Sequence, residues 1–135
     1  MLFRSTARIA GAITYAESAY AKQNNLPVAK VKNNAGNYVA PTAAGVSAFL
    51  GSAKTNANGS LTLDYKTTNP AAYELGTTSY ALVSTAYKDP NKGAAVKGLM
   101  TYMLNECAKK FPETEFAVIE GPLKTFNEAQ IAKIK

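Results

Sequence analysis

The sequence predicts an α/β fold, and three of its features point to that class. Short β-branched or aromatic runs such as Ala12–Tyr15 and Tyr80–Ser84 are typical of strands. These runs alternate with segments of helical apolar spacing, the clearest of which follows Asp89. Clusters rich in Asn and Gly separate the segments and are typical of turns. In a chain of 135 residues, such alternation indicates material for about one α/β domain.

The first half of the chain is expected to contain two helices and several short strands. Gly36 lies in an Asn-rich cluster, where it is free to adopt the positive φ of a tight turn. Thr42 is a good N-cap, because its hydroxyl can accept a hydrogen bond from the first turn of a helix. That helix would bury an apolar stripe of Val46, Phe49, Leu50 and Ala53. The expected order is a strand at Ala12–Tyr15, a helix at Glu17–Gln23, a strand-like Val28–Val31, a turn at Asn33–Asn37, an extended Tyr38-Val39, the helix from Thr42, a surface loop at Ser52–Ser60 and a short strand at Leu61–Leu63.

The second half is expected to contain one buried strand and the longest helix. The mostly apolar Tyr80–Ser84 suits a strand that is buried on both faces. Asp89 is a good N-cap, and Pro90 then occupies the first helical position. Cys107 belongs to the apolar stripe of this helix and is interpreted as a core residue. A last helix is expected from the capping-box pattern that begins at Thr125. The stripe comprises Val96, Leu99, Met100, Met103, Leu104, Cys107 and Phe111.

The composition argues against several classes of function. The net charge of +6 comes from 15 basic and 9 acidic residues, and the lysines occur singly or in pairs. We interpret them as a solubilising surface, with steering of a small anion as the alternative. The chain has no His, only one Cys and no carboxylates at ligand spacing, so no metal centre or internal disulfide is expected. It also has no Gly-x-Gly-x-x-Gly motif or phosphate loop, and no cofactor is expected. Scattered tyrosines argue against nucleic-acid binding, and no apolar run is long enough to span a membrane.

Catalysis is not expected, because no nucleophile with a neighbouring base is recognisable in the sequence. The candidates for ligand contact are Thr14, Tyr15 and Glu17, which follow a predicted strand at its junction with a helix. In open α/β sheets, ligands bind beyond the carboxyl ends of the strands. The alternative is that these three are ordinary strand-end and helix-start residues.

Three motifs in series carry a resemblance to a known family. They are Gly11–Pro27 (Gly-Ala-Ile-Thr-Tyr-Ala-Glu-Ser-Ala-Tyr-Ala-Lys-Gln-Asn-Asn-Leu-Pro), Asn33–Thr42 (Asn-Asn-Ala-Gly-Asn-Tyr-Val-Ala-Pro-Thr) and Tyr73–Val83 (Tyr-Glu-Leu-Gly-Thr-Thr-Ser-Tyr-Ala-Leu-Val), the last followed by Tyr87–Lys92. Their order and spacing resemble the C-terminal half of bacterial phosphate-specific ABC-transporter substrate-binding proteins. The similarity extends over about residues 10–135.

The resemblance implies a type II periplasmic-binding fold, in which two α/β lobes flank a cleft. Residues 9–72 would be a segment of the second lobe, and residues 73–135 would supply the return crossover strand and the C-terminal helices of the first lobe. The implied function is extracytoplasmic capture of inorganic phosphate, at the periplasm or cell surface, for delivery to an ABC permease. A monomer is expected, with a lipid anchor upstream of this chain as a further implication. The family's Arg followed by Ser-Gly-Thr is not matched by Arg4-Ser5-Thr6, so no ligand residue is assigned from the family.

The chain is therefore expected to be a C-terminal fragment with incomplete sheets and without the main anion ligands. No signal peptide is recognisable, and Met1–Ser5 resembles a translated sequencing adapter. Residues 1–8 are accordingly expected to be a cloning or assembly artefact or a disordered arm. Two other functions stay open: binding of another oxyanion such as sulfate or molybdate, and a structural or adhesive surface role without a ligand.

Overall fold

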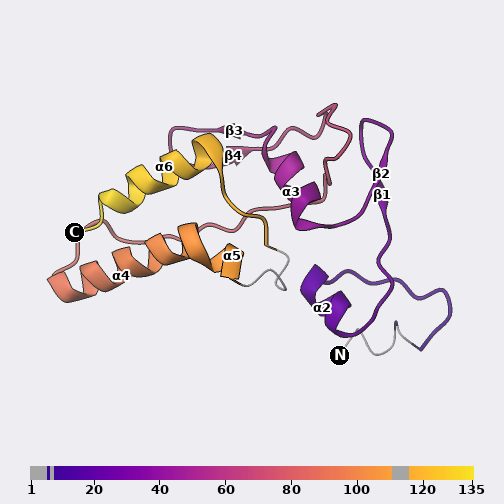
Figure 1. Cartoon of the computed structure of the whole chain (residues 1–135), viewed down its shortest axis with the longest axis horizontal. Helices are drawn as coiled ribbons and strands as arrows, with labels where there is room; N and C mark the ends of the chain where they lie inside the picture. The colour runs from indigo at the N-terminus through magenta and orange to yellow at the C-terminus, as the bar shows by residue number, and fades with distance from the viewer. Residues whose placement is uncertain (1–5, 7, 111–115) are drawn as a thin grey trace.

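The computed structural model describes residues 6, 8–110 and 116–135 as a small mixed α/β protein (Figure 1). Its strands form two separate two-stranded antiparallel sheets within these residues, rather than part of a parallel sheet. The elements are α2 (Ser18–Gln23), β1 (Val31–Lys32), β2 (Tyr38–Val39), α3 (Ala43–Leu50), β3 (Lys54–Thr55), β4 (Leu61–Thr62), α4 (Pro90–Tyr102), the π-helical turn η1 (Met103–Cys107), α5 (Ala108–Lys110) and α6 (Gly121–Ala132).

The two hairpins are built alike. In β1–β2, Gly36 donates to Asn33 O at 2.9 Å, and Asn33 N donates to Asn37 O at 2.8 Å. In β3–β4, Gly59 donates to Asn56 O at 2.9 Å, and Asn56 N donates to Ser60 O at 2.9 Å. Both glycines have positive φ, as the turn requires, so the prediction for Gly36 is confirmed.

Helix α3 begins where the sequence predicts. Thr42 Oγ1 accepts from Gly45 N at 3.1 Å, so Thr42 is the N-cap. Phe49 is fully buried and its ring centroid lies 5.4 Å from that of Tyr65. Ala72 is also fully buried, so the core of this unit lies between α3 and the loop that follows β4. The predicted helix at Glu17–Gln23 is also confirmed, with Glu17 as its N-cap.

Helices α4 and α6 lie side by side and form a second unit (Figure 1). Asp89 Oδ1 accepts from Asn91 N at 2.9 Å and Pro90 opens α4, as predicted. Beyond α6, Ile134 is 3% exposed and Lys135 N donates to Thr85 O at 3.1 Å. Burial of Ile134 and this backbone pairing fix the end of the described chain to the segment before α4.

The apolar stripe of α4 is less buried than the sequence predicts. Leu99 and Met103 are about half exposed, and Cys107 is half-buried rather than a core residue. The π-helical turn η1 bears only on Cys107 at its end, because one extra residue in a turn rotates the side chains that follow it by roughly 100°. Helix α6 is the main helix that packs on α4, and it covers only part of the apolar stripe. The rest of the stripe is therefore exposed.

Both apolar strand predictions are wrong. Ala12–Tyr15 and Tyr80–Ser84 lie outside any strand, and Leu82 is 95% exposed. A strand exists only through its ladder hydrogen bonds, and among the described residues no strand pairs with either run. Of the strand predicted at Val28–Val31, only Val31 lies in a strand, which is β1 (Val31–Lys32). The strand predicted at Leu61–Leu63 is confirmed over Leu61–Thr62.

Two further predictions need correction. The expected loop at Ser52–Ser60 contains strand β3, which pairs with β4. The last helix begins before Thr125, because Glu120 is the N-cap and Pro122 lies in the first turn. Phe111, and all of residues 1–8 except 6 and 8, lie outside the described residues.

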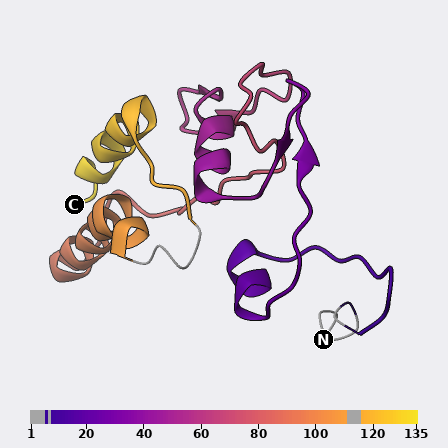
Figure 2. The ribbon, with the colours of Figure 1, turned by 45° about the vertical axis from the view of Figure 1, so that its right-hand side comes forward.

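Helix α2 stands apart from the other helices (Figure 2). Ser18 Oγ donates to Pro41 O at 3.2 Å and so links α2 to the loop before α3. Ala21 is the buried residue of this helix.

Helix α6 reaches the second hairpin, because a Cβ built on Gly59 would lie 2.8 Å from Phe126.

Candidate functional site

The three candidates from the sequence lie together on the irregular segment before α2. Thr14 is half-buried, whereas Tyr15 is 95% exposed. Glu17 is exposed and caps α2 through its backbone carbonyl, which accepts from Tyr20 N and Ala21 N at 3.1 Å each. The strand end that suggested a ligand site is absent, and a ligand role for these residues stays a prediction.

A hollow of about 270 Å³ lies between α4 and α6. Lys97 and Thr101 line it from α4, Asn105 from η1, and Glu128 and Ile131 from α6. It combines a cation, a carboxylate, a hydroxyl and an amide with apolar surface.

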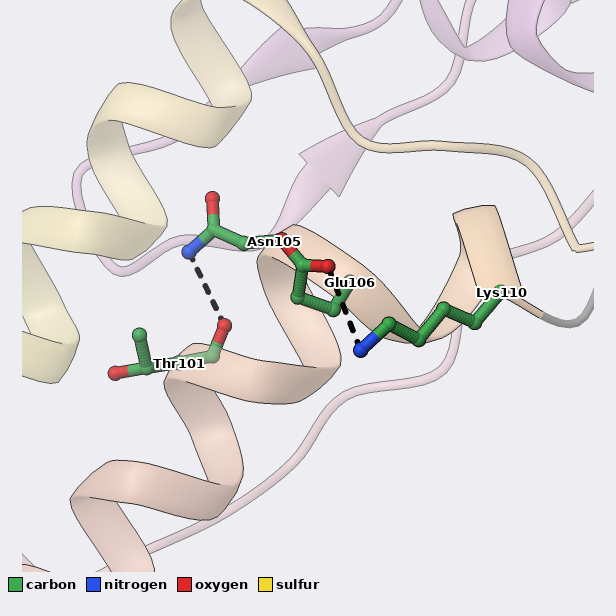
Figure 3. A network of polar contacts seen from close by, with 4 residues as sticks. All are labelled: Thr101, Asn105, Glu106 and Lys110. Atoms are coloured by element: carbon green, nitrogen blue, oxygen red, sulfur yellow. Dashed lines mark hydrogen bonds and ion pairs between the residues drawn. The ribbon is translucent and has the colours of Figure 1, made fainter.

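The polar groups of the hollow are engaged by the helices themselves. Lys97 Nζ donates to Ala132 O at 3.1 Å and to Ile134 O at 3.3 Å, so it satisfies carbonyls at the end of α6. Thr101 Oγ1 donates to Lys97 O at 2.8 Å. Figure 3 shows Asn105 turned toward the Thr101 carbonyl, to which its Nδ2 donates at 3.1 Å. These bonds hold helices α4 and α6 in place, so the polar groups of the hollow have structural roles.

Charged groups near the hollow also pair along their own helices. Glu106 Oε2 lies 3.7 Å from Lys110 Nζ, as Figure 3 shows, and Glu128 Oε1 lies 3.8 Å from Lys124 Nζ. Both are exposed i,i+4 pairs, which typically contribute only about 0.3–0.5 kcal/mol. The Lys110 ammonium also lies 5.3 Å from the centroid of the Tyr102 ring.

The phenol of Tyr80 has a lowered pKa, and its neighbours explain why. A hydrogen bond with the Thr78 side chain, and then one from Leu61 N, lower the pKa of Tyr80 below its usual value, while slight burial opposes them. Leu61 N lies 2.9 Å from the phenolic oxygen. The contact attaches the start of the exposed Tyr80–Ser84 run to strand β4.

Asn33 is a structural residue that sequence reasoning treated only as part of a turn. It is 6% exposed, and its amide Nδ2 donates to Pro70 O and Ala72 O at 3.1 Å each. Next to it, Asn34 N donates to Glu74 Oε1 at 2.8 Å. The pattern Asn-x-x-Gly occurs at both Asn33 and Asn56, and this recurrence indicates two similar turns. It does not indicate that Asn33 is buried.

Metal binding has no candidate group in the described residues, where no three His, Cys, Asp or Glu side chains lie together. None of the described helices is both long and apolar enough to cross a membrane.

No known family model matches the sequence, and no solved structure matches it significantly. Over the described residues, the structure is that of a small mixed α/β protein with two small two-stranded antiparallel sheets.

Proposed function

We propose that this chain is part of an extracytoplasmic phosphate-capture protein of the ABC-transporter type. It would supply scaffold and crossover structure, while most of the anion ligands lie elsewhere in the protein. The proposal rests first on the three motifs in series at Gly11–Pro27, Asn33–Thr42 and Tyr73–Val83. Its structural support is the state of the Tyr80–Ser84 run.

The Tyr80–Ser84 run has the composition of a strand, but no strand pairs with it among the described residues. Leu82 is 95% exposed, Tyr80 55% and Val83 39%. Full burial of one such side chain is worth about 1.5–3 kcal/mol, so their exposure leaves considerable apolar surface uncovered. A crossover strand taken without its neighbouring strands would present this combination of apolar side chains and unpaired backbone.

The segment before α2 gives a second instance of the same state. Ile13 and Tyr15 are each 95% exposed, on the run that the sequence predicts to be a strand. Two separate apolar runs therefore lack sheet partners among the described residues. Ala12–Tyr15 lies within the first motif of the family resemblance, and Tyr80–Val83 lies within the third.

Phosphate binding by the longer protein tests the proposal. Sequencing the source DNA on both sides of this stretch would establish the reading frame, and the protein that it encodes would be titrated calorimetrically with phosphate and with sulfate at matched ionic strength. The family resemblance implies an Asp acceptor among the anion ligands, outside this chain. We therefore expect micromolar affinity for phosphate and much weaker binding of sulfate, because a buried carboxylate rejects an anion that carries no proton. Preference for sulfate or molybdate would identify another oxyanion as the ligand.

The 135-residue chain serves as the control for ligand location. We expect it to bind phosphate weakly or not at all. Micromolar affinity in this chain alone would contradict the view that the main ligands lie outside it. A full reading frame without a Ser-Gly-Thr segment, whose product binds no oxyanion, would favour the structural or adhesive role.

Exposed aromatic side chains give that second candidate some support. Tyr15, Tyr38, Tyr65 and Tyr80 are all more than half exposed, and such side chains are enriched at protein interfaces. The phosphate titration separates the two roles, because an adhesive surface needs no anion cleft.

A further inference from the structure

The stretch from Thr77 to Ser84 is a span held at both ends. Before it, Gly76 N donates to Tyr73 O at 3.0 Å. After it, Lys135 N donates to Thr85 O at 3.1 Å, which secures the approach to α4. Figure 1 shows this part of the chain running lengthwise from the α3 unit to the start of α4.

Between these anchors the backbone is unpaired. The N–H and C=O groups of residues 79–83 bond to no other backbone group among the described residues. Tyr80 is held through its side chain, whose oxygen accepts from Leu61 N. A backbone segment with free donors and acceptors is a template for another strand.

Charge favours a copy of the same segment as the partner. The protein carries a net charge of +6, so two copies repel each other in general. No charged residue occurs from Thr77 to Tyr87, however, and this stretch contains neither Pro nor Gly. Low charge, β-branched and aromatic side chains, and the absence of Pro are the properties of self-pairing segments.

The sequence of the segment is also close to self-complementary in an antiparallel arrangement. With Leu82 opposite Leu82, Ala81 faces Val83 and Tyr80 faces Ser84. Both central pairs are apolar, and the two 95% exposed leucines would cover each other. We propose that Tyr80–Ser84 forms a two-fold antiparallel strand pair with the same segment of a second copy of this chain.

The proposal departs from the monomer that the family resemblance implies, and it does not depend on phosphate capture. A longer protein that covers the segment with its own strands would not pair in this way. Self-pairing is thus a property of the chain in its present length, and sedimentation of this chain tests it separately from any anion titration.

Matched lysine substitutions test the site by analytical ultracentrifugation over a range of concentrations. Leu82→Lys places two like charges opposite each other, and Ile13→Lys makes the same chemical change at a residue that is also 95% exposed. We expect the original chain to dimerise with rising concentration. Leu82→Lys should weaken the dimer by at least about tenfold, since it removes two buried leucines, whereas Ile13→Lys should leave it nearly unchanged.

Cysteine pairs test the register in a Cys107→Ala background, with oxidised glutathione accepting the electrons and protons of the two thiols. Opposite Cβ atoms in an antiparallel pair lie about 4.5–5.5 Å apart, close enough for a disulfide after small adjustment. Leu82→Cys should crosslink to itself, and Ala81→Cys should crosslink to Val83→Cys when the two variants are mixed. Ile13→Cys is the control and should remain largely uncrosslinked.

Several results would overturn the proposal. One is a chain that stays monomeric at every concentration tested. Another is equal weakening by Leu82→Lys and Ile13→Lys, which would indicate unspecific apolar association. Preferential crosslinking of Ala81→Cys with itself would exclude the antiparallel register centred on Leu82.

Discussion

The side chain of Asn33 joins the first hairpin to the loop before Tyr73 by hydrogen bonds, and its replacement by alanine should be strongly destabilising. The side chain is 6% exposed. Its Nδ2 lies 3.1 Å from Pro70 O and from Ala72 O, and 3.4 Å from Asn69 O. Its Oδ1 accepts from Asn37 N at 2.9 Å. The amide thus joins the β1–β2 turn to a segment that lies far along the chain.

The size of the effect follows from these contacts. An amide NH₂ has two protons, so the three carbonyls share about two good hydrogen bonds, and Oδ1 accepts a third. Each bond contributes about 0.5–1.5 kcal/mol net, and alanine would also leave buried carbonyls without a donor. We expect Asn33→Ala to lower the free energy of unfolding by about 2–4 kcal/mol.

The second hairpin provides a matched control. Asn56 occupies the same turn position, but its Nδ2 donates to the hydroxyls of Ser60 at 3.0 Å and Thr62 at 3.1 Å. These partners lie nearer the surface, where water can replace the amide. Asn56→Ala should therefore lower the free energy of unfolding by less than about 1 kcal/mol. Urea unfolding followed by far-ultraviolet circular dichroism measures both variants.

Equal losses of unfolding free energy in the two variants would refute this reasoning, since burial is the difference between the sites.

The pH dependence of Asn33→Asp gives a second check. Surrounding carbonyl oxygens disfavour a carboxylate, so the pKa of the introduced carboxyl group should be raised in the folded state. Stability of this variant should be greatest at pH values below the unfolded pKa and should fall as pH rises through the folded pKa.

Three further predictions concern the core, a turn and a tyrosine. Phe49→Ala should lower the free energy of unfolding by about 3–5 kcal/mol in urea melts, because the ring is fully buried. Gly59→Ala should destabilise more than Gly36→Ala in the same assay: both have positive φ, but only at Gly59 would the added Cβ meet Phe126, at 2.8 Å. Tyr80→Phe should remove the tyrosinate absorbance that appears below the usual pKa of tyrosine, because the pKa of Tyr80 is lowered. The stabilisation that the Tyr80 phenolate gives the original chain should be fully present above the ordinary tyrosine pKa of about 10. It should be lost as pH falls through the pKa of Tyr80 in the folded state.

Local chemistry made several parts of the fold predictable. The Thr42 and Asp89 N-caps hold in the structure, because an N-cap bond joins groups only two or three residues apart. The positive φ of Gly36 follows for the same reason, since the turn closes on itself. The last helix shows the limit of local patterns. Thr125 matched a capping box, yet the helix had already begun beside Pro122, where proline suits the first turn.

The candidate site was predictable only as a set of neighbouring residues. Thr14, Tyr15 and Glu17 were singled out because a strand was expected to end beside them, and the strand is absent. The hollow between α4 and α6 was not predicted, because Lys97 and Ile131 meet only when the two helices pack. No local pattern encodes such a meeting of distant residues.

By itself, the sequence determined the caps, the tight turns and the apolar character of each segment. Only the tertiary structure decided which apolar segments find partners. Phe49 is buried because α3 meets the loop around Ala72, whereas Leu82 is exposed although its neighbourhood is just as apolar. The physical reason is that burial and strand pairing need a second surface. A chain segment specifies its own side chains, but the surface that covers them comes from elsewhere in the fold.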